Sequence, residues 1–328
     1  MAGFRVLHPR GPGARGVFVA AALLASALLM GSCGDDGTSP PLNVERPRFD
    51  GEAAQALIER QVAFGPRVPG REGHAAQLAW MAARLDSLAD EVELQTFQYA
   101  HSMVDTVLDL TNVVARFRPE SPRRILFLAH WDTRPFSDQA ETFEERLLPV
   151  PGANDGGSGT AVLLQLAAHL AQAGLPEGRG VDLLLTDGED FGPTLDDMLL
   201  GARHFAERAD PVWEFAVLLD LVGDATPSFP IERFSLQFAP DEVATIWAVA
   251  ADLGYGDAFP TDGGRFIQDD HIPLNEAGIP TVNIIDFDYG PDNGLWHTPD
   301  DTPDKTRAST LRMVGEVVLE LVYGDAAW

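Results

Sequence analysis

Short apolar runs, separated by segments with helical periodicity, constrain the fold of this chain most. Ile125–Ala129, Val181–Leu185 and Phe215–Leu219 are brief and almost wholly apolar, as expected of strands that are buried on both faces of a sheet. A segment of helical pattern, Ser158–Ala173, lies between the first two runs. Strands that alternate with helices predict an α/β layered fold.

The rest of the chain up to Trp328 adds further elements without an internal repeat or a second linker. Asp50 is a suitable N-cap for a first helix. We therefore expect one domain over residues 50–328. The remaining expected helices are 50–64, 75–88, 199–208, 241–253 and 306–322, and the remaining expected strands are 92–97, 107–117, 234–238 and 281–285.

Charge and cysteine content exclude several classes of function. The chain has 23 Lys and Arg against 50 Asp and Glu, a net charge of −27. A surface this acidic repels phosphate backbones, which excludes nucleic-acid binding. Cys33 is the only cysteine, so the chain has no disulfide framework and no thiolate zinc cluster. A metal site here has to use His, Asp and Glu.

The N-terminus has the features of an export signal. Arg5, Arg10 and Arg15 precede an apolar stretch, Val17–Met30, which is too short to span a bilayer comfortably. Small residues directly before Cys33 resemble a bacterial lipoprotein signal, with Met30 where leucine is usual. An ordinary secretory signal that happens to contain a cysteine is the alternative. The position of this single cysteine favours the lipoprotein.

The lipoprotein resemblance implies three segments and a location. Residues 1–32 are the signal peptide, which is cleaved before Cys33, and the thiol of Cys33 is then lipidated. Residues 33–49 are rich in Pro, Gly, Ser and Thr and are expected to form a flexible tether. The chain is thus expected to be exported to a bacterial cell envelope, in the periplasm or at the cell surface, and anchored to a membrane through its lipid.

Imidazoles and carboxylates recur where the expected strands end. In α/β sheets the ligand crevice lies beyond the carboxyl ends of the strands, so these side chains are expected to gather there. Neutral imidazole and carboxylate oxygens are the ligands of catalytic zinc. The segments concerned are His130-Trp131-Asp132, Asn154-Asp155-Gly156, Glu189-Asp190, Asp220, Asp269-Asp270-His271 and Trp296-His297.

Read in order, these residues resemble the M28 zinc peptidase superfamily, and more narrowly its glutaminyl cyclase branch. The resemblance covers about residues 50–323 and implies a single three-layer domain. Its centre is a twisted, mostly parallel mixed sheet flanked by helices, as in zinc-dependent exopeptidases. The segments that carry the resemblance are LAHWDTRPFSD, GANDGGSG, LLTDGEDFG, LLGARHFA, VLLDLVG, DGGRFIQDDHIPLNEAGIP and LWHTPDDTPD.

The resemblance also implies roles for individual residues. Zn²⁺ is the implied cofactor, with one tightly bound ion and room for a second. His130 and Asp220 resemble the second-metal ligands of two-zinc aminopeptidases, and Asp132 would orient His130. The remaining roles are metal ligand for Asp155, Asp190 and His297, general base and acid for Glu189, acidic partner of the reacting amide for Asp220 and Asp270, and aromatic pocket wall for Trp296.

Two features depart from the family pattern. The second acid of the pair is Asp190, where many relatives have Glu, so its shorter side chain requires a closer approach of the backbone to the metal. The loop Phe191–Leu200 is short and lacks the tryptophan that animal cyclases place there. A more open pocket is the expected consequence.

The implied activity is glutaminyl-peptide cyclotransferase, which converts the N-terminal glutamine of peptides or proteins to pyroglutamate and releases ammonia. A two-zinc M28 aminopeptidase on the same scaffold is the first alternative. An inactive lipoprotein that uses the fold for binding is the second, and the presence of every ligand-type residue disfavours it.

Overall fold

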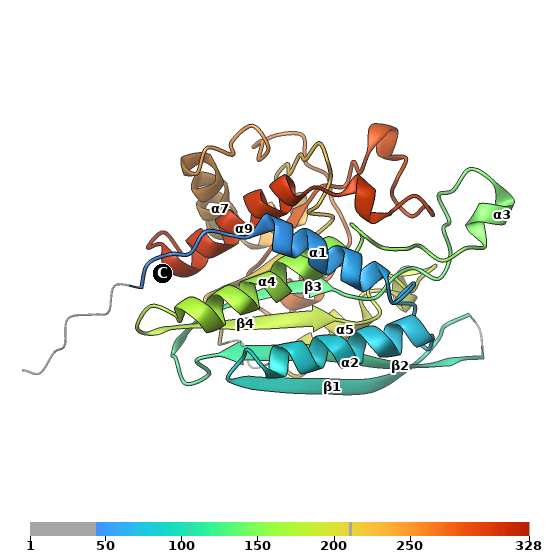
Figure 1. Ribbon diagram of the computed structural model, residues 1–328, viewed down its shortest axis with the longest axis horizontal. Helices are drawn as coiled ribbons and strands as arrows, with labels where there is room; N and C mark the ends of the chain where they lie inside the picture. Colours follow the sequence, from blue (N-terminus) through green and yellow to red (C-terminus); the bar gives the residue numbers. More distant parts are fainter. Residues whose placement is uncertain (1–43, 104, 210–211, 328) are drawn as a thin grey trace, which may run out of the picture. The chain divides into compact units, whose positions relative to one another are not determined.

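Six strands form one sheet in the computed structural model, which describes residues 44–103, 105–209 and 212–327 (Figure 1). The strand order is β1-β2-β4-β3-β5-β6. The last four strands in this order are parallel to one another, whereas β2 is antiparallel to both β1 and β4. The predicted mixed, mostly parallel sheet is confirmed. The strands are β1 Glu91–Ala100, β2 Val107–Phe117, β3 Arg123–His130, β4 Arg179–Thr186, β5 Phe215–Asp220 and β6 Thr281–Ile285.

Helices cover both faces of the sheet and make a three-layer domain. On β3, Ile125 and Phe127 point into a large core with α1, α2, α4, α7 and α9, whereas Leu126 and Leu128 point into a second core with α5 and α8. This alternation of side chains is the normal geometry of a strand. The helices are α1 Gly51–Val62, α2 Glu72–Asp86, α3 Phe143–Arg146, α4 Gly157–Ala173, α5 Leu200–Ala206, α6 Arg233–Phe238, α7 Pro240–Asp252, α8 His271–Glu276 and α9 Ala308–Tyr323.

The parallel strands end at one edge of the sheet. His130 is the last residue of β3 and pairs with Thr186 at the end of β4, while Asp220 ends β5 beside Ile285 at the end of β6. The loops that follow these strands therefore leave the sheet close together. This edge is where the predicted site residues are expected to meet.

The expected strand at 234–238 is wrong, because this segment is helix α6. The Glu232 carboxylate accepts the backbone N–H groups of Phe234 and Ser235, which caps a helix N-terminus. The alternating Phe-x-Leu-x-Phe pattern suggested a strand. Leu236 is instead 49% exposed, while Ser235 is buried and its Oγ accepts the backbone N–H of Asn283 on β6.

The domain begins slightly before the predicted boundary at residue 50. Phe49 is buried against α9 and its backbone N–H donates to Glu316 at 2.8 Å, and Arg46 also pairs with Glu316. Residues 44–49 of the expected tether thus pack on the domain. The predicted signal peptide, Cys33 and the rest of the tether lie outside the described residues. None of the helices in the described part of the chain is long and apolar enough to cross a membrane.

Candidate metal centre and active site

Three side chains from three separate loops converge at the carboxyl edge of the sheet. Asp155 lies in the turn before α4, Asp190 follows β4, and His297 lies between β6 and α9. Their ligand atoms all lie within 4.8 Å of one another, and all three side chains are buried. His297 Nε2 is 3.6 Å from Asp155 Oδ2 and 3.5 Å from Asp190 Oδ1. These are the three residues that the family resemblance implied as metal ligands.

A second group of buried ligand atoms shares Asp155. His130, Asp155 and Asp220 also lie within 4.8 Å of one another. His130 Nε2 is 3.2 Å from Asp155 Oδ1 and 3.3 Å from Asp220 Oδ1. The two oxygens of Asp155 thus face two different histidines. Asp155 is therefore common to the two groups of side chains that could each hold a metal ion.

The backbone around Asp155 is held by an acid that the sequence argument did not single out. Asp301 is buried, and its carboxylate accepts the backbone N–H groups of Asn154 at 2.8 Å and Asp155 at 3.1 Å. The next residue, Gly156, has φ +72°, and a Cβ there would lie 2.8 Å from the His130 ring. Only glycine lets the turn approach that histidine so closely.

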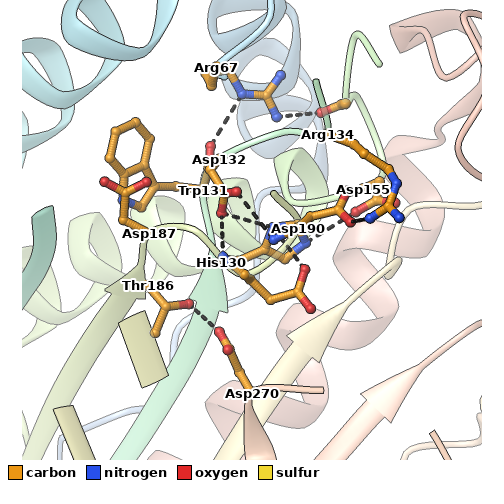
Figure 2. Close-up of polar contacts among 12 residues, drawn as sticks. Arg67, His130, Trp131, Asp132, Arg134, Asp155, Thr186, Asp187, Asp190 and Asp270 are labelled. Carbon is orange, nitrogen blue, oxygen red and sulfur yellow. Dashed lines mark hydrogen bonds and ion pairs between the residues drawn. The ribbon is translucent and has the colours of Figure 1, made fainter. Parts of the chain in front are cut away.

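Asp132 supports the acid pair directly. Its two carboxylate oxygens accept the backbone N–H groups of Glu189 at 3.1 Å and Asp190 at 3.2 Å (Figure 2). Asp132 was expected to orient His130, and its Oδ1 does lie 3.5 Å from His130 Nδ1. That nitrogen nevertheless has no hydrogen-bond partner among the described residues. The hydrogen bonds of Asp132 therefore act mainly on the loop that carries Glu189 and Asp190.

Arg134 and Asp138 are a further pair that the sequence argument missed. The Arg134 guanidinium is 2.5 Å from Asp190 Oδ1 (Figure 2). It also contacts Asp138. Asp138 in turn lies 3.1 Å from His297 Nδ1. Burial opposes ionisation of Asp138, but His297 and Arg134 lower its pKa to about 2. The available signal was a basic residue inside the acid-rich segment that follows Asp132.

The acids implied to surround the reacting amide are buried close to the candidate ligands. Asp220 ends β5, and Asp270 accepts the Thr186 hydroxyl at the end of β4 (Figure 2). Asp270 Oδ1 has no hydrogen-bond partner within the described residues. Neighbouring Asp269 accepts the side-chain amide of Asn283 at 2.7 Å. A reacting group in this space would therefore meet carboxyl groups from the end of β5 and from the loop before α8.

Burial and mutual repulsion raise the proton affinity of these acids. Burial raises the pKa of Glu189 well above its ordinary value; His130 opposes this shift, and the charges of Asp190, Asp269 and Asp270 add to it. Burial, followed by the charge of Asp269, raises the pKa of Asp270 to about 7. At neutral pH this group of acids therefore retains protons that isolated carboxyls would lose.

His297 is held in an uncommon backbone conformation next to the implied pocket wall. Its φ is +54°, a left-handed value that costs free energy for a non-glycine residue. The Trp296 ring stacks on the His297 ring with centroids 3.8 Å apart and also contacts Phe287 at 5.0 Å. The two aromatic residues thus fix the direction of the imidazole.

The residues present fit a divalent metal. Asp190 Oδ2 is buried without a hydrogen-bond partner in the part of the chain that the structure describes, although its other oxygen is bound by Arg134. An orphaned carboxylate oxygen in such a place requires a cation or a donor. Two carboxylates and one imidazole, buried at a strand edge, match the three-ligand sets of catalytic zinc that leave one position for substrate.

The fold and the site define a metal-dependent α/β enzyme of the zinc exopeptidase type. The sequence matches peptidase family M28 over residues 112–322, and the chain belongs to this family. A glutaminyl-peptide cyclotransferase of Drosophila melanogaster is 26% identical over 265 residues, which cover 72% of this chain and 70% of the relative.

Solved structures resemble the chain more closely. A glutaminyl cyclase of Bacteroides thetaiotaomicron, bound to N-acetylhistamine, is 34% identical with a TM-score of 0.80, covering 86% of this chain and 100% of the other. A zinc-dependent exopeptidase of Parabacteroides distasonis is 34% identical with a TM-score of 0.81 over the same shares. The family and the exopeptidase-like fold that the sequence resemblance implied are confirmed.

Proposed function

We propose that this protein is a zinc-dependent glutaminyl-peptide cyclotransferase that acts on peptides or proteins with an N-terminal glutamine. One observation carries the proposal. The cluster of Asp155, Asp190 and His297, with Glu189 beside it, lies in a fold that matches a solved glutaminyl cyclase over that protein's entire length. The curated cyclotransferase relative supports the same reaction.

In this reaction the α-amine of the N-terminal glutamine attacks the γ-carbonyl carbon of the same residue. A C–N bond forms to close the five-membered ring, the bond to the amide nitrogen breaks, and ammonia leaves. Because both groups belong to one residue, holding that residue in a folded conformation supplies much of the rate. Zn²⁺, when bound by Asp155, Asp190 and His297, would supply Lewis-acid polarisation of a carbonyl.

Glu189 is placed to move the proton. It is buried, it stands next to the candidate ligand Asp190, and its pKa is well above the ordinary range. A carboxylate with a raised proton affinity is a better base for the attacking amine, and its acid form can then protonate the departing amide nitrogen. The same proton is taken and returned, so the reaction needs no water.

Asp220 and Asp270 are suited to binding the reacting amide. With a pKa of about 7, Asp270 is partly protonated at neutral pH, and its Oδ1 atom has no hydrogen-bond partner among the described residues. A protonated carboxyl can donate a hydrogen bond and an ionised one can accept it. A protonated Asp270 and an ionised Asp220 can therefore bind the carbonyl and the amine side of the substrate between them.

The two-zinc aminopeptidase is retained as a second candidate on one specific observation. His130, Asp155 and Asp220 form a second group that could hold a metal, and it shares Asp155 with the first. This geometry is compatible with two ions as well as one. We propose one tightly bound Zn²⁺, because cyclisation requires no second ion to activate water.

Mass spectrometry of the products separates these candidates. The enzyme is incubated with a peptide that begins with glutamine, alongside an enzyme-free sample that measures spontaneous cyclisation. Loss of ammonia from the intact peptide supports the cyclase. Loss of a whole residue supports the aminopeptidase. An unchanged peptide with the zinc-loaded protein supports the inactive binding lipoprotein.

We also propose that the protein is an exported lipoprotein of the bacterial cell envelope. The support comes from the N-terminal sequence alone: basic residues, a short apolar stretch, and the single cysteine Cys33 after small residues. Membrane anchoring would hold the domain at a surface where exported peptides and proteins pass.

A further inference from the structure

Two charged side chains, those of Arg134 and Asp138, link two of the candidate metal ligands to each other. Arg134 is 7% exposed. Its Nη1 donates to Asp190 Oδ1 at 2.5 Å, while its Nε and Nη2 donate to Asp138 Oδ2 at 3.0 Å and 2.8 Å. The other oxygen of Asp138 lies 3.1 Å from His297 Nδ1. Two residues of the loop after β3 thus join Asp190 and His297, which come from two other loops.

Each contact occupies one polar atom of a candidate ligand and leaves a second polar atom of the same side chain available to a metal. With Nη1 of Arg134 on Asp190 Oδ1, the second oxygen, Oδ2, has no hydrogen-bond partner among the described residues. With the Asp138 carboxylate on Nδ1 of His297, the proton of the imidazole is held at Nδ1. The lone pair is then at Nε2, the nitrogen that faces Asp155 and Asp190.

The loop that carries the pair is itself fixed to the same structure. Val150 N–H donates to the Arg134 carbonyl at 3.1 Å, and Gln139 N–H donates to the His297 carbonyl at 3.3 Å. Gly192 passes close to the guanidinium, and a Cβ there would lie 3.0 Å from Arg134 Nη2. The pair is therefore held from several sides, as a positioning device requires.

We propose that Arg134 and Asp138 are positioning residues that hold Asp190 and His297 in the geometry for metal binding. Together they form the Arg134–Asp138 clamp. The inference rests on the metal-binding part of the proposed function and not on the reaction, so it holds for a cyclase and for an aminopeptidase alike. Neither side chain of the clamp is assigned a contact with the reacting atoms.

Metal affinity of the full-length chain tests the clamp without any assay of turnover. Asp138→Asn removes the charge that holds His297 Nδ1, and Arg134→Lys keeps the positive charge but loses the fork that reaches both acids. Loss of such outer contacts weakens metal binding about 10- to 100-fold. We expect each variant to weaken Zn²⁺ binding in that range, measured by competition with a chromophoric chelator.

A double-mutant cycle adds a readout that general loosening of the fold would not produce. If the clamp acts as a unit, the variant with both changes binds Zn²⁺ about as weakly as the worse single variant, because the second change removes contacts that are already lost. If the two changes acted independently, their fold-losses of Zn²⁺ affinity would multiply in the double variant. The visible spectrum of the Co²⁺-substituted protein should shift in Asp138→Asn, since it reports the orientation of the imidazole ligand.

A matched control comes from a second buried arginine fork at the opposite end of β3. Arg124 contacts Asp182 through Nε and Nη2. Arg124→Lys should lower the melting temperature but leave the Zn²⁺ affinity within about twofold of wild type, because it acts on the fold and not on the ligands. If Asp138→Asn and Arg134→Lys fold and also keep a Zn²⁺ affinity within about twofold of wild type, the clamp proposal is wrong.

Failure of the metal assignment gives a different result. His297→Ala removes a proposed ligand outright. If Zn²⁺ affinity is unchanged in His297→Ala as well as in the clamp variants, both the metal site and the clamp are refuted. If His297→Ala loses Zn²⁺ while the clamp variants keep it, the metal site stands and only the clamp is wrong. If Asp138→Asn does not fold, the Zn²⁺ affinity of Arg134→Lys still decides between these outcomes.

Discussion

Asp132 accepts the backbone N–H of Glu189 at 3.1 Å, and this bond joins the end of β3 to the loop after β4. The Glu189 backbone is thus held independently of its own carboxylate, which lies 3.8 Å from His130 Nδ1. A change confined to that carboxylate should leave the loop in place. Glu189 can therefore be tested for chemistry separately from structure.

Glu189→Gln should abolish most turnover while the protein keeps its zinc. The amide has nearly the same size as the carboxyl but cannot accept the proton of the attacking amine. Loss of a general base costs about 100- to 10,000-fold in rate. We expect kcat to fall by that order with zinc content and peptide affinity near those of wild type, measured by steady-state kinetics and elemental analysis.

A matched glutamate on the surface serves as the control. Glu207 follows α5, and its carboxylate is well exposed beside Arg208. Glu207→Gln should leave kcat unchanged. Retained turnover in a zinc-loaded Glu189→Gln variant would remove Glu189 from the mechanism.

The two histidines of the centre should differ in their effect on metal content. His297→Ala removes a ligand of the proposed tight site, so zinc and turnover should both be lost. His130→Ala should keep the tight zinc and cause a smaller defect, because His130 belongs to the second group with Asp155 and Asp220. Elemental analysis of each purified variant gives the count. Two tight zinc ions in wild type, with one lost in His130→Ala, would favour the aminopeptidase.

Asp286 should make the stability of the fold depend on pH. Burial raises its pKa to about 7; the backbone N–H of Ser228 opposes this, and the charge of Asp224 adds to it. In the unfolded chain the same carboxyl titrates near pH ~4. Between these values the folded state binds more protons, so its stability falls as the pH rises through this window.

Asp286→Asn removes that dependence, because the amide stays neutral and its oxygen can still accept the N–H of Ser228. The variant should therefore become more stable relative to wild type as the pH rises from about 5 to about 8. The compared quantity is the free energy of unfolding. A growth of a few kcal/mol is expected, since one pKa unit is worth about 1.4 kcal/mol. Urea unfolding across this range measures it. Parallel curves for the two proteins would contradict a raised pKa for Asp286.

Cys33→Ala should release the protein from membranes without loss of activity. Cys33 is the only thiol and lies before the described domain, so its substitution removes the proposed lipid and leaves the site intact. Fractionation of expressing bacteria, followed by a salt wash, measures the location. Retention of the variant on washed membranes would contradict the lipoprotein proposal.

Local sequence was sufficient for most of the secondary structure. The Asp50 side chain accepts the N–H of Ala53 and caps α1 as predicted, and β6 has the predicted bounds. The cap depends on two residues that are close in sequence, and the strand depends on a short apolar run. Segment 234–238 was misread because its helix depends on the buried Glu232 carboxylate, which also pairs with His271 from a distant part of the chain.

The types and order of the site residues were also readable in the sequence, because acids and histidines recur after the apolar strands and match the family pattern in order. Only the tertiary structure decided which atoms meet. In the structure, the Asp132 carboxylate binds the backbone N–H of Asp190. Arg134 contacts Asp190, and Asp138 contacts His297. Contacts of this kind depend on ångström-scale distances between separate loops. Those distances follow from the packing of the whole domain and not from spacing along the chain.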